Sequence, residues 1–168
     1  MPDRGSLPDM SLRARAVIPD GEGRILFDRT HHPGKAPFYW LPGGGVDPGE
    51  TAEEALRREL IEEARLVIAV RRLLYVSENL FVESGDYRHE TILYFLAEVT
   101  GREPGDPVDP RSHEWHPPDA TPAPFLPPDV AKAVVLDLAD GFRRPIQHLV
   151  TDERPAWAAR AAGQVGTA

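Results

Sequence analysis

The chain contains no cysteine among its 168 residues. This absence excludes disulfide bonds, thiolate zinc sites and cysteine nucleophiles together. Long apolar runs are missing too: no stretch is long enough to span a bilayer, and the N-terminus lacks an apolar run of signal-peptide length. From these absences we expect a cytoplasmic protein without a membrane partner.

Positive charge is scarce. The chain has 27 Asp and Glu against 19 Lys and Arg, so its formal net charge is -8. This excess of negative charge disfavours long nucleic acid and anionic membrane surfaces as partners. A small phosphorylated substrate stays compatible, because bound divalent cations can reverse the local sign of a site.

The length and the hydrophobic content of 41% fit one domain with a substantial core. We expect residues 11–150 to form this domain. Residues 1–10 are polar and contain Pro and Gly, which predicts a flexible N-terminus. Residues 151–168 are expected to form a C-terminal extension that is partly disordered.

The N-terminal half predicts strands followed by a helix. Residues 11–18 alternate as a half-buried strand does, and residues 24–29 are typical of the returning strand of a hairpin. Residues 39–46 begin as a short strand that breaks at Pro42 and the glycines. Residues 51–64 lack Gly and Pro and predict a helix, with Thr51 and Glu54 as a capping box.

The C-terminal half predicts a long hairpin and a second helix. The β-prone runs 66–82 and 87–100 flank a turn at 83–86, and residues 128–142 predict a helix that stops at Gly141. Between them, residues 112–116 predict an edge strand with Trp115 packed and His113 and His116 partly exposed. These elements together predict an α+β domain layered as an α/β/α sandwich.

Three carboxylates cluster on the first predicted helix. Glu59, Glu62 and Glu63 fall within an arc of about 100°, since a helix has about 3.6 residues per turn. They would supply hard oxygen ligands that suit Mg²⁺ or Mn²⁺. The alternative is a solvated acidic face whose arginines form weak surface ion pairs. The three glycines at 43–45 could likewise be an ordinary turn.

The combined spacing is more specific than either feature. Five residues separate Gly44 from Glu50, seven separate Glu50 from Arg58-Glu59-Leu60, and one separates Leu60 from Glu62-Glu63. This spacing resembles the signature of the Nudix (MutT-like) hydrolases, G-x5-E-x7-R-E-U-x-E-E-x-G-U, where U is bulky and aliphatic. Leu66 matches the last U. The resemblance implies a mixed central sheet with the box helix on one side and the C-terminal helix on the other.

One position departs from this signature: Arg65 stands where the pattern has glycine. A glycine there typically adopts a left-handed conformation, which costs a residue with Cβ about 1 kcal/mol. Either Arg65 tolerates this strain or the helix ends differently. Because all the carboxylates precede Arg65, we expect the metal site to survive.

The resemblance implies Mg²⁺-dependent hydrolysis of a nucleoside diphosphate linked to another moiety, by attack of water at phosphorus. Its metal ligands would be Glu59, Glu62, Glu63 and a carbonyl such as that of Gly44. Arg58 would orient a carboxylate, with Glu50 as its partner, and Gly43 and Gly45 would shape the loop. Glu62 is the expected general base; Glu98 and Glu114 are alternatives outside the box.

The expected substrate contacts precede the box: His31, Lys35, Tyr39 and Trp40 could reach phosphate or stack on a base. The alternative is a solvent loop with two aromatic core anchors, which we favour for Trp40. Subfamily marks for ADP-ribose, NADH and coenzyme A substrates are absent. Nucleoside triphosphates, nucleotide sugars and dinucleotide polyphosphates remain open, and so do a homodimer and a catalytically silent module that binds a nucleotide or a protein.

Overall fold

The computed structural model describes residues 9–30, 34, 36–83, 85–108 and 111–154. The strands are β1 (Asp9–Val17), β2 (Ile25–Thr30), β3 (Phe38–Trp40), β4 (Gly43–Gly45), β5 (Leu66–Glu83), β6 (Asp86–Arg102), β7 (Ser112–His116) and β8 (Gln147–Asp152). The helices are α1 (Ala52–Ala64) and α2 (Pro128–Ala139). The strands form a five-stranded mixed sheet, in the order β4-β1-β6-β5-β8, and a three-stranded sheet, in the order β3-β2-β7.

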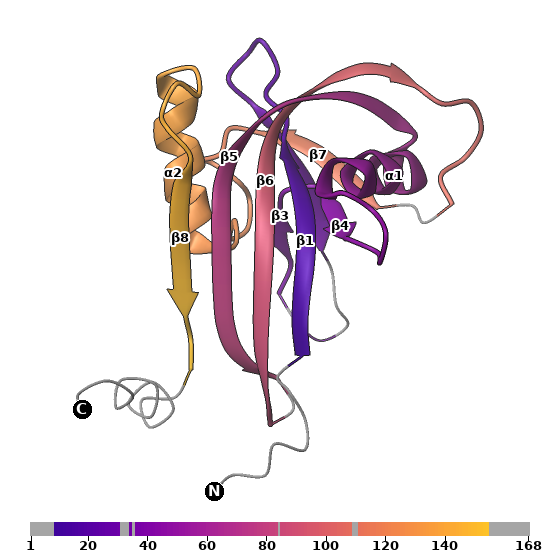
Figure 1. Ribbon diagram of the computed structural model, residues 1–168. Coiled ribbons are helices and arrows are strands. Elements are labelled where there is room, and N and C mark those ends of the chain that lie inside the picture. The colour runs from indigo at the N-terminus through magenta and orange to yellow at the C-terminus, as the bar shows by residue number, and fades with distance from the viewer. Residues whose placement is uncertain (1–8, 31–33, 35, 84, 109–110, 155–168) are drawn as a thin grey trace, which may run out of the picture.

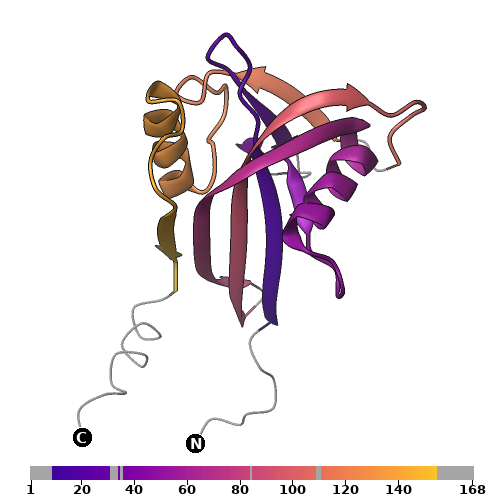
Figure 2. The same ribbon diagram turned by 45° about the horizontal axis from the view of Figure 1, so that its top comes forward.

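The two helices lie on opposite sides of the larger sheet (Figures 1 and 2). The alternation of side chains along β1 explains why, since successive residues face opposite sides. Ala14 and Ala16 pack in one core with Leu56 and Leu60 of α1. Val17 belongs to the other core, which includes Val130, Ala133 and Val134 of α2. The predicted α+β layering is confirmed.

The predicted hairpin between residues 11–18 and 24–29 is confirmed at its turn but is wrong for the two strands, which separate beyond it. Strands β1 and β2 belong to different sheets. Across their shared turn the backbone is antiparallel: Pro19 bridges Ile25, the Leu26 N–H donates to the Ile18 carbonyl at 3.0 Å, and the Asp20 N–H donates to the Arg24 carbonyl at 2.9 Å. Both edges of β1 are already occupied, by β4 and by β6, so β2 has no edge of β1 to pair with.

The strand breaks before Pro42 as predicted, since β3 ends at Trp40, but the three glycines do not extend this break and form strand β4 against β1. Gly43 has a φ of 130°, which L side chains rarely adopt, and a Cβ there would overlap the Ala14 carbonyl. The absence of side chains therefore lets β4 pair closely with β1 while α1 packs over both.

The long hairpin of β5 and β6 and the second helix are confirmed. Gly141, with a φ of 70°, lies just beyond the end of α2. Strand β8 was not predicted; it pairs in parallel with β5. The strands begin at Asp9 and end at Asp152, two residues outside the expected domain at each end. Residues 1–8 and 155–168, which carry the predictions of flexibility, lie outside the described residues.

Strand β7 is the edge strand that was predicted, and His113 and His116 are partly exposed as expected, but Trp115 is not packed. Trp115 is 37% exposed, whereas only 10% of the His113 side chain is exposed. The last turn of α1 explains this, because Glu63 lies over His113 with their side chains 4.0 Å apart. In the ranges that the structure describes, no helix is long and apolar enough to cross a membrane.

Candidate active site

Helix α1 is fixed at its start by the predicted capping box. The Glu54 N–H donates to Thr51 Oγ1 at 3.2 Å, and the Thr51 N–H donates to the Glu54 carboxylate at 2.8 Å. These bonds satisfy backbone donors that a helix start leaves open. By fixing the start of the helix, they help to define the direction in which the acidic side chains of its last two turns point.

The helix ends at Arg65 in the left-handed conformation, with φ 57° and ψ 24°. Its N–H donates to the Ile61 carbonyl at 2.9 Å, as the glycine of the signature would do. Of the two alternatives, Arg65 therefore tolerates the strain. Its guanidinium donates from Nε to the Pro104 carbonyl at 3.2 Å, which ties the helix end to the segment after β6.

Arg58 connects the acids of the helix to the loop before it. Its Nε and Nη2 donate to the two oxygens of Glu50 at 2.7 and 2.9 Å, and Nη2 also donates to the Gly45 carbonyl at 3.1 Å. Its Nη1 donates to Glu59 at 3.1 Å and to Glu62 at 3.3 Å. The bidentate pair lowers the pKa of the Glu50 carboxyl to about 2.

The Glu59 carboxylate lies directly against the backbone of Gly44. A Cβ added at Gly44 would overlap all three atoms of that carboxylate. Only 17% of the Glu59 side chain is exposed. Glycine at position 44 therefore makes the room in which this acid sits against strand β4.

Glu63 is the buried member of the acidic group, with 4% of the residue exposed. Its Oε1 lies 3.3 Å from Arg111 Nε, but its Oε2 has no hydrogen-bond partner among the described residues. Burial raises the pKa of the Glu63 carboxyl to about 8, although the charges of Arg111 and Arg15 oppose the shift. A buried carboxylate oxygen without a partner is costly, so it suits an incoming cation.

The donor chemistry of this group fits a hard divalent cation, since all three acids supply oxygen. Within the described ranges, however, no three acidic or histidine side chains are arranged as a metal site. Arg58 holds one oxygen each of Glu59 and Glu62, while Glu63 turns toward Arg111. The residues present fit the metal by their chemistry and by the free Glu63 oxygen.

The two aromatic residues before the box, Tyr39 and Trp40, have the opposite roles from those expected. Tyr39 is the core anchor: it is 2% exposed, and its hydroxyl donates to Glu114 at 2.7 Å. Trp40 instead lines a cavity, with its Nε1 donating to Thr30 Oγ1 at 2.5 Å. The expectation that Trp40 is a core anchor is therefore corrected.

The remaining sequence candidates lie outside the described residues or away from the acids of α1. His31 and Lys35 fall in the parts that the structure does not describe. Glu98 pairs with Arg71, and Glu114 accepts from Tyr39 and lies 2.9 Å from His116 Nε2. Neither alternative base makes a described contact with Glu59, Glu62 or Glu63.

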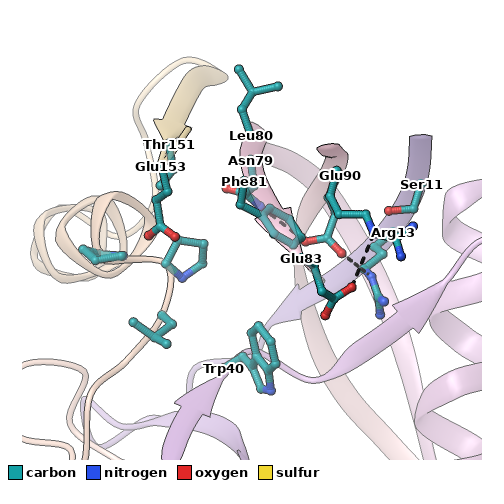
Figure 3. Close-up of a pocket in the computed structure, with 14 residues that line it drawn as sticks. Ser11, Arg13, Trp40, Asn79, Leu80, Phe81, Glu83, Glu90, Thr151 and Glu153 are labelled. Atoms are coloured by element: carbon teal, nitrogen blue, oxygen red, sulfur yellow. Dashed lines mark hydrogen bonds and ion pairs between the residues drawn. The ribbon is translucent and has the colours of Figure 1, made fainter. Parts of the chain in front are cut away.

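The cavity beside Trp40 has a volume of about 530 Å³, and sequence reasoning missed most of its lining. Figure 3 shows side chains from β1, β5, β6 and β8 around it. One signal was available in β5, where Tyr75, Ser77, Asn79 and Phe81 occupy alternate positions. Alternate residues of a strand share one face of the sheet, so Ser77 and Asn79 between two aromatic residues indicate that this part of the face is not an ordinary apolar core.

Comparison with known proteins agrees with this geometry. The model of the NUDIX domain matches residues 10–136. The chain belongs to the Nudix family. Its resemblance to these hydrolases, predicted from the spacing of the box, is confirmed.

Curated Nudix relatives are similar at modest identity. An RNA pyrophosphohydrolase from Erythrobacter litoralis is 32% identical over 164 residues, which cover 89% of this chain and 95% of that protein. The NAD-capped RNA hydrolase NudC from Pectobacterium carotovorum is 30% identical over 122 residues. That match covers 72% of this chain, which spans only 44% of the length of the NudC protein.

Solved structures share the fold. A NUDIX hydrolase from Nitrosomonas europaea superposes with a TM-score of 0.64 at 22% identity, covering 82% of this chain and 93% of that one. An ADP-ribose pyrophosphatase from Streptococcus suis superposes with a TM-score of 0.60 at 20% identity, covering 83% of this chain and 98% of that one. These likenesses establish the Nudix fold around the acidic helix.

Proposed function

We propose that this protein is a Mg²⁺-dependent pyrophosphohydrolase that cleaves a nucleoside diphosphate linked to another moiety, with water attacking phosphorus. The observation that carries the proposal is the buried Glu63 oxygen without a partner, on the helix that also presents Glu59 and Glu62. Similar proteins are named for RNA ends, NAD-capped RNA and ADP-ribose, which all contain a nucleotide.

Glu59, Glu62 and Glu63 would hold the metal, with a backbone carbonyl such as that of Gly44. When bound, Mg²⁺ or Mn²⁺ would supply positive charge to neutralise the phosphate and would lower the pKa of a water. The protein's own groups then have separate tasks. Arg58 holds one carboxylate oxygen each of Glu59 and Glu62. The exposed Glu62 carboxylate accepts the proton of the attacking water.

The assignment of Glu62 as base rests on its exposure. Its side chain is 41% exposed, against 17% for Glu59, and Glu63 is buried. Glu62 can therefore meet a water molecule from the solvent side without leaving the helix surface. Its one described partner, Arg58, remains bound to Glu50 if Glu62 moves.

The test is release of phosphate or pyrophosphate from a panel of nucleotide derivatives, with Mg²⁺ and with a chelator. The panel holds nucleoside triphosphates, nucleotide sugars, dinucleotide polyphosphates, ADP-ribose, NAD and a short triphosphate-ended RNA. We expect metal-dependent turnover, lowered about 100-fold or more in Glu62→Gln. The net charge of -8 favours the small compounds over the RNA.

Glu53→Gln is the matched control, because Glu53 lies on the same helix but pairs with Arg57 at its solvent side. It should keep full activity and the wild-type melting temperature. Tight binding of a nucleotide without turnover of any compound would contradict the hydrolase. That result would instead favour a catalytically silent Nudix module.

A further inference from the structure

Two buried polar atoms face each other between the end of α1 and strand β7. Glu63 Oε2 lies 4.0 Å from His113 Nε2. Within the ranges that the structure describes, neither atom has a hydrogen-bond partner. Only 4% of the Glu63 side chain and 10% of the His113 side chain are exposed, so bulk solvent does not satisfy them. Such a pair destabilises the fold unless something binds between its members.

The hydrogen bond at the other ring nitrogen defines the tautomer of His113. Its Nδ1 lies 3.1 Å from the carbonyl oxygen of Arg111. A carbonyl oxygen can only accept, so Nδ1 carries the hydrogen and donates it. Burial lowers the pKa of His113, which favours the neutral ring. In this neutral tautomer Nε2 presents a lone pair and has no hydrogen to donate to Glu63.

Two electron-pair donors therefore face one another across 4.0 Å. A carboxylate oxygen and an imidazole lone pair are both ligands for metal ions. Histidines that bind metals usually donate their second ring N–H to a carboxylate or a backbone carbonyl, as His113 does to Arg111. An ion bound at about 2.1 Å by each atom spans up to about 4.2 Å, so the separation is within the reach of a single ion.

A buried aspartate adds negative charge behind this pair. Asp28 of β2 is in register with His113, so the two side chains lie on the same face of the three-stranded sheet. It is 4% exposed, and its charge acts on both Glu63 and His113. Two guanidiniums oppose it, since Arg111 lies 3.3 Å from Glu63 Oε1 and the charge of Arg15 also acts on Glu63. Arg111 occupies one carboxylate oxygen and leaves the other to a cation.

The second histidine of β7 does not share this arrangement. His116 Nε2 lies 2.9 Å from Glu114 Oε2, and its ring packs edge-on against Tyr39 with 5.2 Å between the ring centroids. Residues three apart on a strand face opposite sides of the sheet. Of the two histidines, His113 is therefore the one that meets the acidic helix.

We propose that His113 is a nitrogen ligand of the metal and that it shares the ion with Glu63. Mg²⁺ prefers oxygen ligands, whereas imidazole suits transition metals. The site should therefore take a transition metal such as Mn²⁺ or Co²⁺ in preference to Mg²⁺. The inference rests on the proposed hydrolase, because it names a further ligand, outside the box, for the metal that this hydrolase would use.

The test is pulsed electron paramagnetic resonance of Mn²⁺ bound to the full chain without nucleotide. Strong coupling of the electron spin to ¹⁴N reports a nitrogen ligand, and oxygen ligands do not produce it. We expect this coupling in the wild type and its loss in His113→Asn. Bound Mn²⁺ without nitrogen coupling, or no binding of Mn²⁺ at millimolar concentration, would overturn the inference. Both of these results come from the wild type and need no variant.

Asparagine is the informative replacement at position 113. Its amide N–H can still donate to the Arg111 carbonyl, but it has no atom at the place of Nε2. In calorimetric titrations, the ratio of the Co²⁺ affinity to the Mg²⁺ affinity should fall about tenfold or more in His113→Asn. A purely structural role would weaken both metals equally or leave both unchanged, and an unchanged ratio would contradict the inference.

Two further variants complete the assignment. His148→Asn is the matched control, because His148 lies on β8 and contacts Glu78 at 2.7 Å; it should keep the nitrogen coupling and the affinity ratio. His113→Gln serves if the asparagine variant does not fold. Its amide oxygen can replace Nε2, so it should bind Mn²⁺ without strong nitrogen coupling. Coupling that persisted in His113→Gln would assign the nitrogen to another residue and overturn the inference.

The two proposals can fail separately. Metal-dependent turnover without nitrogen coupling would leave the hydrolase in place and overturn the role of His113. Nitrogen coupling that is lost in His113→Asn, in a protein that turns over no nucleotide derivative, would support the ligand and overturn the hydrolase.

Discussion

Arg65 offers a direct test of backbone strain at the end of the box helix. Its φ of 57° lies in the left-handed region, where a Cβ approaches the following carbonyl oxygen. Its side chain also contributes, since the guanidinium donates to the Pro104 carbonyl. A single change to glycine alters both effects at once. The useful comparison is therefore between Arg65→Gly and Arg65→Ala, which both lose the guanidinium and differ only in Cβ.

The expected difference in unfolding free energy between the two variants follows from the strain of the left-handed backbone and from the backbone entropy of glycine. The left-handed conformation costs a residue with Cβ about 1–2 kcal/mol, while glycine loses about 0.4–1 kcal/mol more than alanine in backbone entropy. Arg65→Gly should therefore be more stable than Arg65→Ala by about 1 kcal/mol. For a chain of this length that difference is about 2–4 °C in Tm. Arg65→Gly itself should lie close to the wild type, because relief of strain offsets the lost hydrogen bond.

Thermal and urea unfolding of both variants measure this difference. The matched control is the pair Arg57→Gly and Arg57→Ala, in the middle of the same helix, where the order must reverse and alanine must be more stable by about 1 kcal/mol. If Arg65→Ala proved as stable as Arg65→Gly, position 65 would not be left-handed in solution. The explanation of how the chain accommodates the missing glycine would then be wrong.

Three further predictions concern the acids. Gly44→Ala should lower turnover about 100-fold or more at an unchanged fold by circular dichroism, because the new Cβ displaces the Glu59 carboxylate. Glu50 has its folded-state pKa lowered from 4.5 to about 2, so its contribution to stability is present above pH 4.5 and is lost as the pH falls toward 2. Acid unfolding of Glu50→Gln should lack that loss. Glu63 has its folded-state pKa raised from 4.5 to about 8, so metal-free protein should lose stability as the pH rises between these values, and Glu63→Gln should not.

The acidic helix could be predicted because its determinants are local in the chain. The capping box spans four residues, and the acids lie within five positions of one helix. Helical geometry alone then brings Glu59, Glu62 and Glu63 to one side. The left-handed turn at Arg65 was one of two alternatives that the sequence left open, because the segment around Pro104 that bonds to Arg65 lies far away in the chain.

The cavity could not be predicted, because its floor is made by register between strands far apart in the chain. Ser11, Glu90, Asn79 and Thr151 meet only when β1 and β8 add to the edges of the β5–β6 hairpin. Strand β8 itself was missed, and its pairing is parallel, which leaves no turn signal in the sequence. The reversed roles of Tyr39 and Trp40 have a similar cause. Alternation separates the two rings, but only the packed sheets decide which face is buried.

Strand β1 contributes to both the packing of α1 and the cavity, since each lies against one of its two faces. Ala14 and Ala16 are small enough for α1 to pack close to the sheet, which brings Glu59 against Gly44. Arg13 and Arg15, on the opposite face, contact the carboxylate of Glu90 and the Trp40 ring respectively. A shift of β1 by one residue against its neighbours would exchange these faces and remove both features together. The alternation of alanine and arginine in this strand therefore links the packing of the acidic helix on one face to the charges beside the cavity on the other.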